Sequence, residues 1–511
     1  MKLKYTLSAI AATLLMQPAL MAAEQVSQAD IDEIWEVLDK VETKAFTDKL
    51  NWSAEMRGRV DSFSYDMKGI GSNIGKPYDA SAPKPERREM AFPQKKEWDP
   101  AYSIRGYLNM GAKLEDISFT GRLRFDHSSQ GNQRLCILSP QDEGADLPAS
   151  STNKFTTFDM DRFYFDLPIF NNSAVPLIVT GGILPTTGGM SSNIIENTPR
   201  RSVFPSLIFD SNAYGGIVTA KMSELLGLDK AYIRFVAGKG YTLNDEMYYY
   251  QCNRENIQNM DILGLFAEFQ IPMGGINNIF WMGIIQDANI KATPFLGGDN
   301  AEDKGSNTNL KYQKDLGSIT NYGFGLEIQK MDVPGGKLDL FAHYAISNPN
   351  GNGNCVNYTD QLNSGDCNGV GVGSTWTPTG TDDTGLGNPD PYYHSEMARG
   401  TLLEDMGQAV YLGAKYIINY KLKTQFGYEF NKGSASWWSA TQGSEDIFNK
   451  LATRGNVNEA YIIQPINKNL YVRVGYLNIE EKYTGSGWHF GTPLAKNATQ
   501  EDLYFLFNAY F

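Results

Sequence analysis

The sequence contains few of the residues that build metal, redox and catalytic sites. It has 4 cysteines and 4 histidines among 511 residues. No cysteine pair has the C-x-x-C spacing of zinc and haem sites, and the chain holds no H-E-x-x-H or G-x-S-x-G motif. Asp382 and Asp383 lack the Asp-x-Asp-x-Asp-Gly spacing of a calcium loop. We therefore expect no enzyme activity, no bound metal and no other cofactor.

Basic residues are also fewer than acidic ones. Lysine and arginine total 45 against 58 aspartates and glutamates, which gives a net charge of -13. A nucleic-acid-binding surface needs a concentrated basic stripe, often beside exposed aromatic side chains. No segment of the sequence has that composition, so we expect no nucleic acid partner.

Long hydrophobic runs are absent after the first residues. Residues 1–23 combine a basic start, an apolar run broken by Pro18, and small residues at Ala22 and Ala23. This pattern predicts a secretory signal peptide, because the run is short for a helical membrane anchor of about 20 residues. Nothing later in the chain approaches the length of an uninterrupted apolar span, which excludes helical membrane crossings.

The chain is rich instead in alternating segments. The stretch KLKTQFGYEFN places Leu422, Phe426 and Phe430 on one face and Lys423 and Glu429 on the other. A repeat of two is that of a β-strand with one apolar and one polar face. About sixteen such strands are predicted, at residues 50–62, 101–114, 116–126, 156–168, 173–184, 214–223, 230–240, 260–272, 277–290, 318–331, 336–347, 406–419, 421–432, 456–465, 468–482 and 501–511.

These strands fit a membrane barrel better than a soluble sandwich. They run about 10–14 residues, whereas soluble strands are nearer five or six and a membrane-spanning strand needs about ten. Short connections such as LED, PMGG and NKN alternate with long ones. The expected fold is an all-β, transmembrane, antiparallel up-and-down β-barrel of about 16 strands over residues 50–511. Too few residues precede it for the plug domain of a TonB-dependent transporter.

The last strand, EDLYFLFNAYF, has an unusually apolar face for a chain end. Leu503, Phe505 and Phe507 alternate with Tyr504 and Asn508. We expect the first set to face lipid. We also expect this strand to pair with residues 50–62, because a closed barrel leaves no unpaired edge.

Residues 24–49 have a different period. Ile31, Ile34, Leu38 and Val41 follow the spacing of one helix face, and Ser27 begins a capping box. The segment predicts a short N-terminal helix. It could form a periplasmic coiled coil or pack at or inside the barrel mouth.

Basic residues dominate the inward faces of the first three strands. The alternation predicts a pore wall with several guanidinium groups that lack partners and that favour anions, unless acidic loops cancel the effect. The alternative is a lumen that fills itself with salt bridges and conducts little, although barrels of this size usually leave an aqueous channel. The predicted wall residues are Arg57, Arg59, Arg105, Lys113, Arg122 and Arg124.

The third long loop, residues 185–213, combines opposed charges with an apolar stretch. Its position resembles that of the loop that narrows general porins. The resemblance implies a constriction at Glu196, Arg200, Arg201 and Asp210, where opposed charges would select solutes. The alternative is an external cap with no role in permeation.

The cysteines fall in predicted outer loops. An exported chain with an even number of cysteines is expected to form disulfides. Cys355 and Cys367 are close enough in sequence for a local bridge, and Cys136 and Cys252 could join each other.

The stretches LNWSAEMRGRVDSFSYD, GGILPTTGG and RRSVFPSLIFDSNAYGGIV carry a family resemblance. Together with the Phe ending, they resemble a family of uncharacterised outer-membrane porins of Gram-negative bacteria, catalogued as a domain of unknown function. The ending Tyr510–Phe511 resembles the assembly signal of outer-membrane barrels. The resemblance implies a location in the cell outer membrane, with outer-membrane lipids and the barrel assembly machinery as partners.

Two functions follow from these observations. The first is a porin for passive diffusion of small hydrophilic solutes, with a homotrimer as the precedent for barrels of this size. The second is a structural or interaction barrel, such as a surface adhesin or a sheath for electron-transfer cytochromes.

Overall fold

The computed structural model describes most of the region predicted to form the barrel. The described residues are 50–70, 94–97, 100–114, 116–128, 155–228, 230–241, 260–272, 276–292, 314–315, 317–351, 405–441, 448–483, 493 and 495–511. The predicted signal peptide, the predicted helix at 24–49, the four cysteines and the Asp382–Asp383 pair lie outside these residues.

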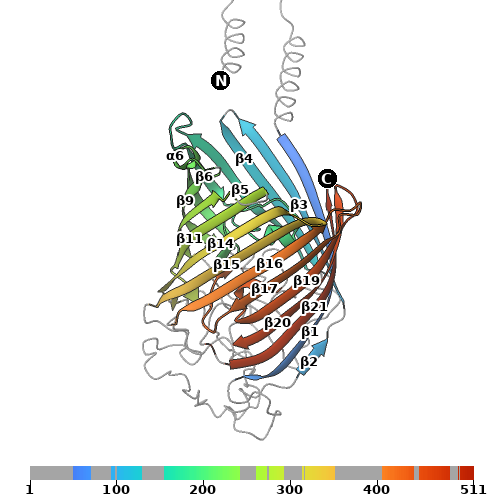
Figure 1. Ribbon diagram of the computed structural model, residues 1–511. Helices are drawn as coiled ribbons and strands as arrows, with labels where there is room; N and C mark the ends of the chain where they lie inside the picture. The colour runs from blue at the N-terminus through green and yellow to red at the C-terminus, as the bar shows by residue number, and fades with distance from the viewer. Residues whose placement is uncertain are drawn as a thin grey trace, which may run out of the picture. The chain divides into compact units, whose positions relative to one another are not determined.

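Among the described residues, seventeen hydrogen-bonded strands form one antiparallel sheet, and sixteen of them close into a barrel (Figure 1). The seventeenth, β2 (Gln94–Glu97), pairs with the end of β1. The barrel strands are β1 (Leu50–Ile70), β3 (Ala101–Leu114), β4 (Ile117–Ser128), β5 (Phe155–Ile169), β6 (Leu177–Ile183), β8 (Asn212–Lys221), β9 (Tyr232–Tyr241), β10 (Asp261–Gln270), β11 (Ile276–Ala288), β14 (Gly317–Val333), β15 (Gly336–Gly351), β16 (Gly407–Ile418), β17 (Gln425–Gly433), β19 (Gly455–Pro465), β20 (Leu470–Tyr483) and β21 (Ala495–Tyr510).

The closure of the barrel confirms the role predicted for the last strand. β21 pairs with β1 from Glu55 opposite Tyr510 to Ile70 opposite Lys496. The final residue takes part: the Phe511 amide donates to the Ala54 carbonyl at 2.8 Å, and the Ala54 amide donates back at 3.1 Å. The chain end is therefore ordered because its backbone groups complete the sheet.

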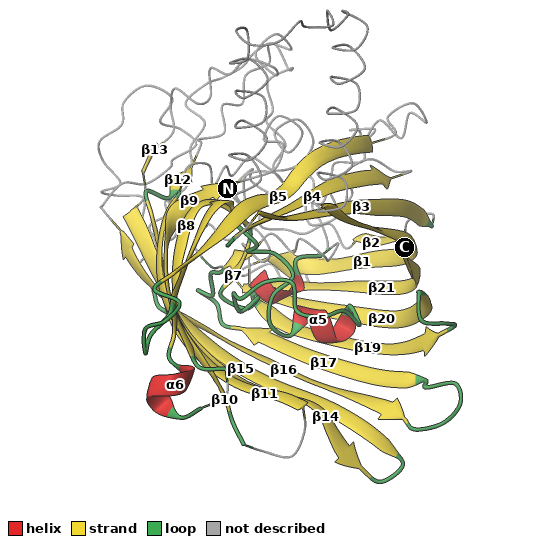
Figure 2. Ribbon diagram, turned by 90° about the horizontal axis from the view of Figure 1, so that it is seen from above, coloured by secondary structure: helices red, strands yellow, loops and turns green. Residues whose placement is uncertain are grey.

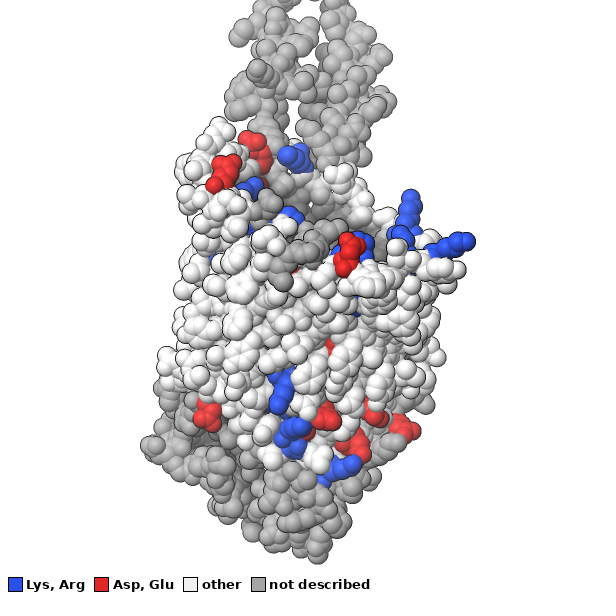
Figure 3. Space-filling view, in the orientation of Figure 1, with Lys and Arg blue, Asp and Glu red and all other residues white. Residues whose placement is uncertain are grey.

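The outer surface has a broad apolar band. In Figure 3 the middle of the visible wall carries few charged residues, and coloured residues gather toward the two ends. Large apolar side chains from strands around the whole barrel point outward and remain exposed, among them Leu108, Phe163, Val218, Leu265, Phe324, Phe426, Val474 and Phe505. A barrel that faces lipid requires this outward band.

β1 and β21 extend further than the sequence predicted. Beyond Val60 the two faces of β1 exchange character: Phe63 and Met67 become buried, while Asp66 and Lys68 point away from the interior. The same positions stay buried along the whole strand, and only the polarity of the two faces is reversed, so the apolar outer face ends before the strand does. The predicted strand at 421–432 begins later, at Gln425, because residues 419–424 form the turn that the Ile418 amide closes on Thr424.

Two long connections fold into the barrel. Inner loop one (184–211) joins β6 to β8 and contains α5 (Ser192–Ile195) and β7 (Phe209–Asp210); inner loop two (434–454) joins β17 to β19 and contains β18 (Ala440–Thr441) and η4 (Lys450–Ala452), with 442–447 outside the described residues. β7 and β18 pair in parallel. Figure 2 shows α5 and β7 inside the ring of strands.

The remaining small elements lie in connections. They are α6 (Ser223–Leu226) between β8 and β9, and β12 (Lys291–Ala292) paired with β13 (Lys314–Asp315). Among the described residues, no helix has the length and apolar content to cross a membrane.

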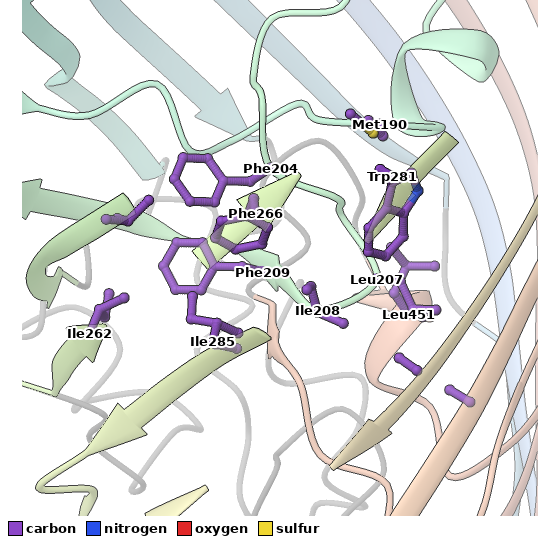
Figure 4. Close-up of a cluster of buried hydrophobic side chains, with 14 of the residues drawn as sticks. Met190, Phe204, Leu207, Ile208, Phe209, Ile262, Phe266, Trp281, Ile285 and Leu451 are labelled. Atoms are coloured by element: carbon purple, nitrogen blue, oxygen red, sulfur yellow. The ribbon is translucent and has the colours of Figure 1, made fainter. Parts of the chain in front are cut away.

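The hydrophobic core lies within the barrel, between inner loop one and the wall. Phe204 packs edge-on against Phe266 of β10, with ring centroids 5.1 Å apart, and also contacts Phe209 (Figure 4). Ile285 of β11 and Trp281 are almost fully buried in the same cluster. Each such side chain contributes about 1.5–3 kcal/mol through burial. The loop is therefore held to the wall by dry contacts.

Candidate functional site

The wall arginines of β1 are all paired, which corrects the expectation of unpartnered guanidinium groups. Arg57 binds Glu196 of inner loop one. Arg59 lies 2.5 Å from Asp61 and 3.0 Å from Asp502. A buried guanidinium must be paired, because an isolated charge in the interior costs several kcal/mol.

The arginines of β3 and β4 are paired in the same way. Arg105 contacts Asp126 at 2.6 Å, and Arg124 binds the same carboxylate. Arg122 lies 2.5 Å from Asp161 of β5. Lys113 is exposed near the end of β3, away from these buried pairs.

A sequence signal for this pairing existed. Arg59 and Asp61, like Arg124 and Asp126, are two residues apart and so share one face of a strand. The pairing is that of the alternative, in which salt bridges form across the lumen wall.

Inner loop one places its four predicted residues inside the barrel. Glu196 binds Arg57, Arg201 binds Glu55, and Arg200 contacts Glu268 of β10 at 3.0 Å. Asp210 differs, because its carboxylate accepts a hydrogen bond from the Gly188 amide within the loop itself. Three of the four residues therefore tie the loop to opposite parts of the wall.

Two cationic side chains and a tyrosine hydroxyl bind the tip of inner loop one, residues 194–196. Lys415 of β16 donates to the Ile194 carbonyl at 2.9 Å, and Arg473 of β20 donates to the Ile195 carbonyl at 2.5 Å. Tyr471 donates to the Glu196 carbonyl at 2.8 Å. The Ile194 carbonyl also accepts a hydrogen bond from the Asn197 amide at 3.3 Å, so the lysine adds a second donor to it. The carbonyls at the end of α5 are satisfied by donors from the wall.

Inner loop two supplies a residue that the sequence analysis missed. The Lys450 ammonium lies 2.7 Å from Glu429 and 2.5 Å from Glu459. The Tyr411 hydroxyl donates to Glu429 at 2.7 Å. Nothing in the local sequence distinguishes this loop from an external one, because its inward fold depends on partners in β16, β17 and β19.

A cavity lined by both charged and apolar side chains lies between the two inner loops and the wall of β1, β16, β19 and β20. Its volume is about 40 Å³, which accommodates about three water molecules. Three cationic and three anionic side chains line it, namely Arg59, Lys450 and Arg473 with Glu196, Asp210 and Glu459. We call this space the lumen cavity.

Tyr504 of β21 lies behind the lumen cavity, in contact with three of the residues that line it. The guanidinium carbons of Arg59 and Arg473 lie 4.3 and 5.4 Å from its ring centroid, and its hydroxyl donates to Glu459 at 2.7 Å. The ring lies over Gly475 of β20, where an added Cβ would meet it at 2.3 Å. Glycine at this position is what lets the tyrosine lean across the neighbouring strand.

A serine, a histidine and an acid meet at β14 and β15, where His343 is the cross-strand partner of Tyr411 in β16. Ser191 Oγ lies 3.1 Å from Glu327 and 3.0 Å from His343 Nε2, and Trp281 Nε1 donates to the same nitrogen at 3.3 Å. The carboxylate bonds to the serine and lies 3.8 Å from the imidazole, so it does not orient the ring as in a catalytic triad. All three side chains are buried. The cluster anchors the loop.

Among the described residues, no group of three or more histidine, cysteine, aspartate or glutamate side chains could hold a metal ion.

Solved structures of similar architecture were found among porins and channels. OprB of Pseudomonas putida at high pH shares 11% identity, with 93% of this chain and 97% of that chain covered and a TM-score of 0.46. OmpF of Salmonella typhi in complex with daunomycin shares 12%, with 90% and 97% covered and a TM-score of 0.41. The outer membrane channel DcaP of Acinetobacter baumannii shares 12%, with 90% and 97% covered and a TM-score of 0.39. The architecture described above rests on this chain's own strand pairing.

No curated protein matches the sequence. A protein family described as "Protein of unknown function (DUF3373)" matches residues 95–506, which is most of the chain. The protein therefore belongs to the DUF3373 family.

Proposed function

We propose that the protein is an outer-membrane porin through which small hydrophilic solutes diffuse passively. The path lies on the charged side of the barrel, through the lumen cavity. Inner loop one narrows this path, and inner loop two forms its other margin. The protein carries out no chemical step on the solute.

The apolar outer band supports the location. A closed barrel satisfies every backbone hydrogen bond among its strands and can therefore face hydrocarbon. The first 23 residues support export, and the Tyr510–Phe511 ending supports delivery by the barrel assembly machinery. Replacing Phe511 by Lys is expected to lower the amount of heat-modifiable barrel in the outer membrane. An unchanged amount of assembled barrel would contradict the proposal that the Tyr510–Phe511 ending is an assembly signal.

The lumen cavity carries the functional proposal. It lies within a barrel whose exterior is apolar, and charges of both signs reach it from loop and wall. Charged walls around a narrow aqueous space select solutes by size and charge. Neither sign dominates the lining, so weak ion selectivity is expected rather than the anion preference that an unpaired basic wall would give.

One observation favours the alternative of a structural barrel. Inner loop one fills part of the lumen with a packed apolar core, which is more than a simple pore requires. A barrel that serves as an adhesin or a cytochrome sheath could be closed by such a core.

Planar-bilayer recording of the purified full-length protein separates the two functions. Stepwise conductance is expected, because the lumen cavity would open into water on both sides. A correctly folded, heat-modifiable barrel that produces no conductance steps would favour the structural function. The same detergent without protein serves as the control for adventitious channels.

A further inference from the structure

An apolar cluster lies next to the lumen cavity, on the side where the long connections join the strands. We call this cluster the outer seal. Its side chains are only 1–3% exposed, and they are those of Phe63, Ala101, Phe448, Val457, Leu477 and Ile479.

The order of residues along the wall strands places the outer seal beyond the cavity. In β1, Arg59 lines the cavity, and Phe63 follows it on the same face toward the long connection after Ile70. In β20, Arg473 lines the cavity, and Leu477 follows it in the same sense. The outer seal therefore separates the lumen cavity from the long-connection end of these strands.

Phe448 connects the outer seal to inner loop two. It belongs to that loop, whereas the other members of the outer seal belong to β1, β3, β19 and β20. Its ring meets the Phe63 ring edge-on, with centroids 6.2 Å apart. Two residues later, Lys450 lines the cavity and contacts Glu459 of β19 at 2.5 Å. Inner loop two thus lies between the cavity and the long-connection end of the barrel.

The described parts of inner loop two, residues 434–441 and 448–454, reach from β15 to β1. The strands between these two are β16, β17, β19, β20 and β21. The Trp438 amide donates to Ser347 Oγ of β15 at 3.2 Å, β18 pairs with β7 of inner loop one, and Phe448 meets Phe63 of β1. The loop therefore lies across the lumen and is attached on both sides.

The two described parts of the loop are also bound to each other. Asn449 Nδ2 donates to the Thr441 carbonyl at 2.8 Å, and Trp437 Nε1 donates to the Leu451 carbonyl at 2.8 Å. These contacts make inner loop two one body, so a displacement of Phe448 displaces the cavity lining supplied by the loop as well.

The size of the lumen cavity requires such a displacement. Its volume of about 40 Å³ accommodates about three water molecules. A larger hydrophilic solute fits only after a neighbouring element has moved. An apolar constriction also excludes water and ions while it is closed.

We propose that inner loop two is a strap that closes the lumen cavity on the long-connection side, and that the contact between Phe448 and Phe63 is its latch. This inference rests on the proposed porin function. While the latch holds, the outer seal separates the cavity from solution on that side. When the strap moves away, the charged lining of the cavity becomes continuous with water.

Single-channel recording of the full-length Phe448→Ala variant in planar bilayers tests the strap. The fraction of time that the channel is open should rise about 2- to 10-fold, because an edge-to-face aromatic pair contributes a factor of that size. The conductance of the open channel and its reversal potential should stay at the wild-type values, because the charged lining is unchanged. Phe426→Ala is the matched control, since Phe426 is 44% exposed on the outer face of β17.

The wall partner tests the latch. Phe63→Ala should also raise the open fraction. In the double variant the rise should be smaller than the product of the two single rises, because both substitutions remove the same contact. A rise equal to that product would overturn the latch, since the two residues would then act independently.

An unchanged open fraction in Phe448→Ala, with normal conductance steps, would overturn the strap and leave the porin function intact. If neither the wild type nor the variants conduct, the porin function fails and the strap fails with it. If Phe448→Ala does not assemble into a heat-modifiable barrel, Phe63→Ala alone decides the question. An unchanged open fraction in that assembled variant would overturn the proposal.

Discussion

The two sides of the lumen hold inner loop one by different forces. On the side of β8–β16, apolar packing of side chains such as Phe204 and Ile208 dominates, with one ion pair between Arg200 and Glu268. On the side of β1 and β20, its tip is held by Glu196 and by backbone carbonyls that bind cations. Dry packing gives a rigid attachment that salt does not alter, whereas charged contacts beside an aqueous space are screened. The loop thus has a fixed base and a tip whose charges can meet solute.

The apolar side is expected to respond most strongly to mutation. Phe204 is 1% exposed, so Phe204→Ala should destabilise the folded barrel by about 3–5 kcal/mol through lost burial and an unfilled cavity. Thermal or denaturant unfolding in detergent measures the change. Phe158→Ala is the control, because Phe158 is 70% exposed on the outer surface. Equal losses in the two variants would contradict a packed core inside the lumen.

An arginine pair away from the lumen cavity should affect stability more than selectivity. Arg122 is paired with Asp161 and lies over the Tyr107 ring, 4.3 Å from its centroid. Arg122→Gln should cost about 1–3 kcal/mol, because a charged hydrogen bond is lost in the interior. The reversal potential across a salt gradient should stay near the wild-type value. A shift toward cations at low salt with unchanged stability would restore the unpaired basic wall.

The charged side should give the clearest change in permeation. Glu196→Gln removes the carboxylate that binds Arg57 and Arg473, so anions should be favoured by about fivefold at 0.1 M salt. The preference should shrink at 1 M salt, where the Debye length is about 3 Å. Reversal potential is the measurement, and Glu501→Gln on the outer face is the control. Equal selectivity in both variants would show that solutes do not pass the loop tip.

Local patterns were sufficient to predict the wall of the barrel. Sixteen strands, their antiparallel order and the closure through β21 followed from a repeat of two and from alternating connection lengths. The outward positions of Leu503 and Phe505 followed from the same repeat. The face on which a strand residue lies can be predicted from the sequence because successive side chains alternate between the two faces.

The contacts of the two inner loops inside the barrel were harder to predict from the sequence. Inner loop one showed its charges and its apolar stretch, but the contact between Glu196 and Arg473 joins residues that are far apart in the chain. Inner loop two gave no signal, since Lys450 acquires its role only where β17 and β19 bring Glu429 and Glu459 together.

The sequence by itself therefore determined that the chain forms a closed barrel with an apolar exterior, because strand period and turn spacing are local properties. Only the tertiary structure decided which charges are paired with which. That outcome depends on distances between side chains from different strands and loops, and electrostatic interaction energies change steeply over those distances. The inward arginines were visible in the sequence, but their partners became visible only in the folded barrel.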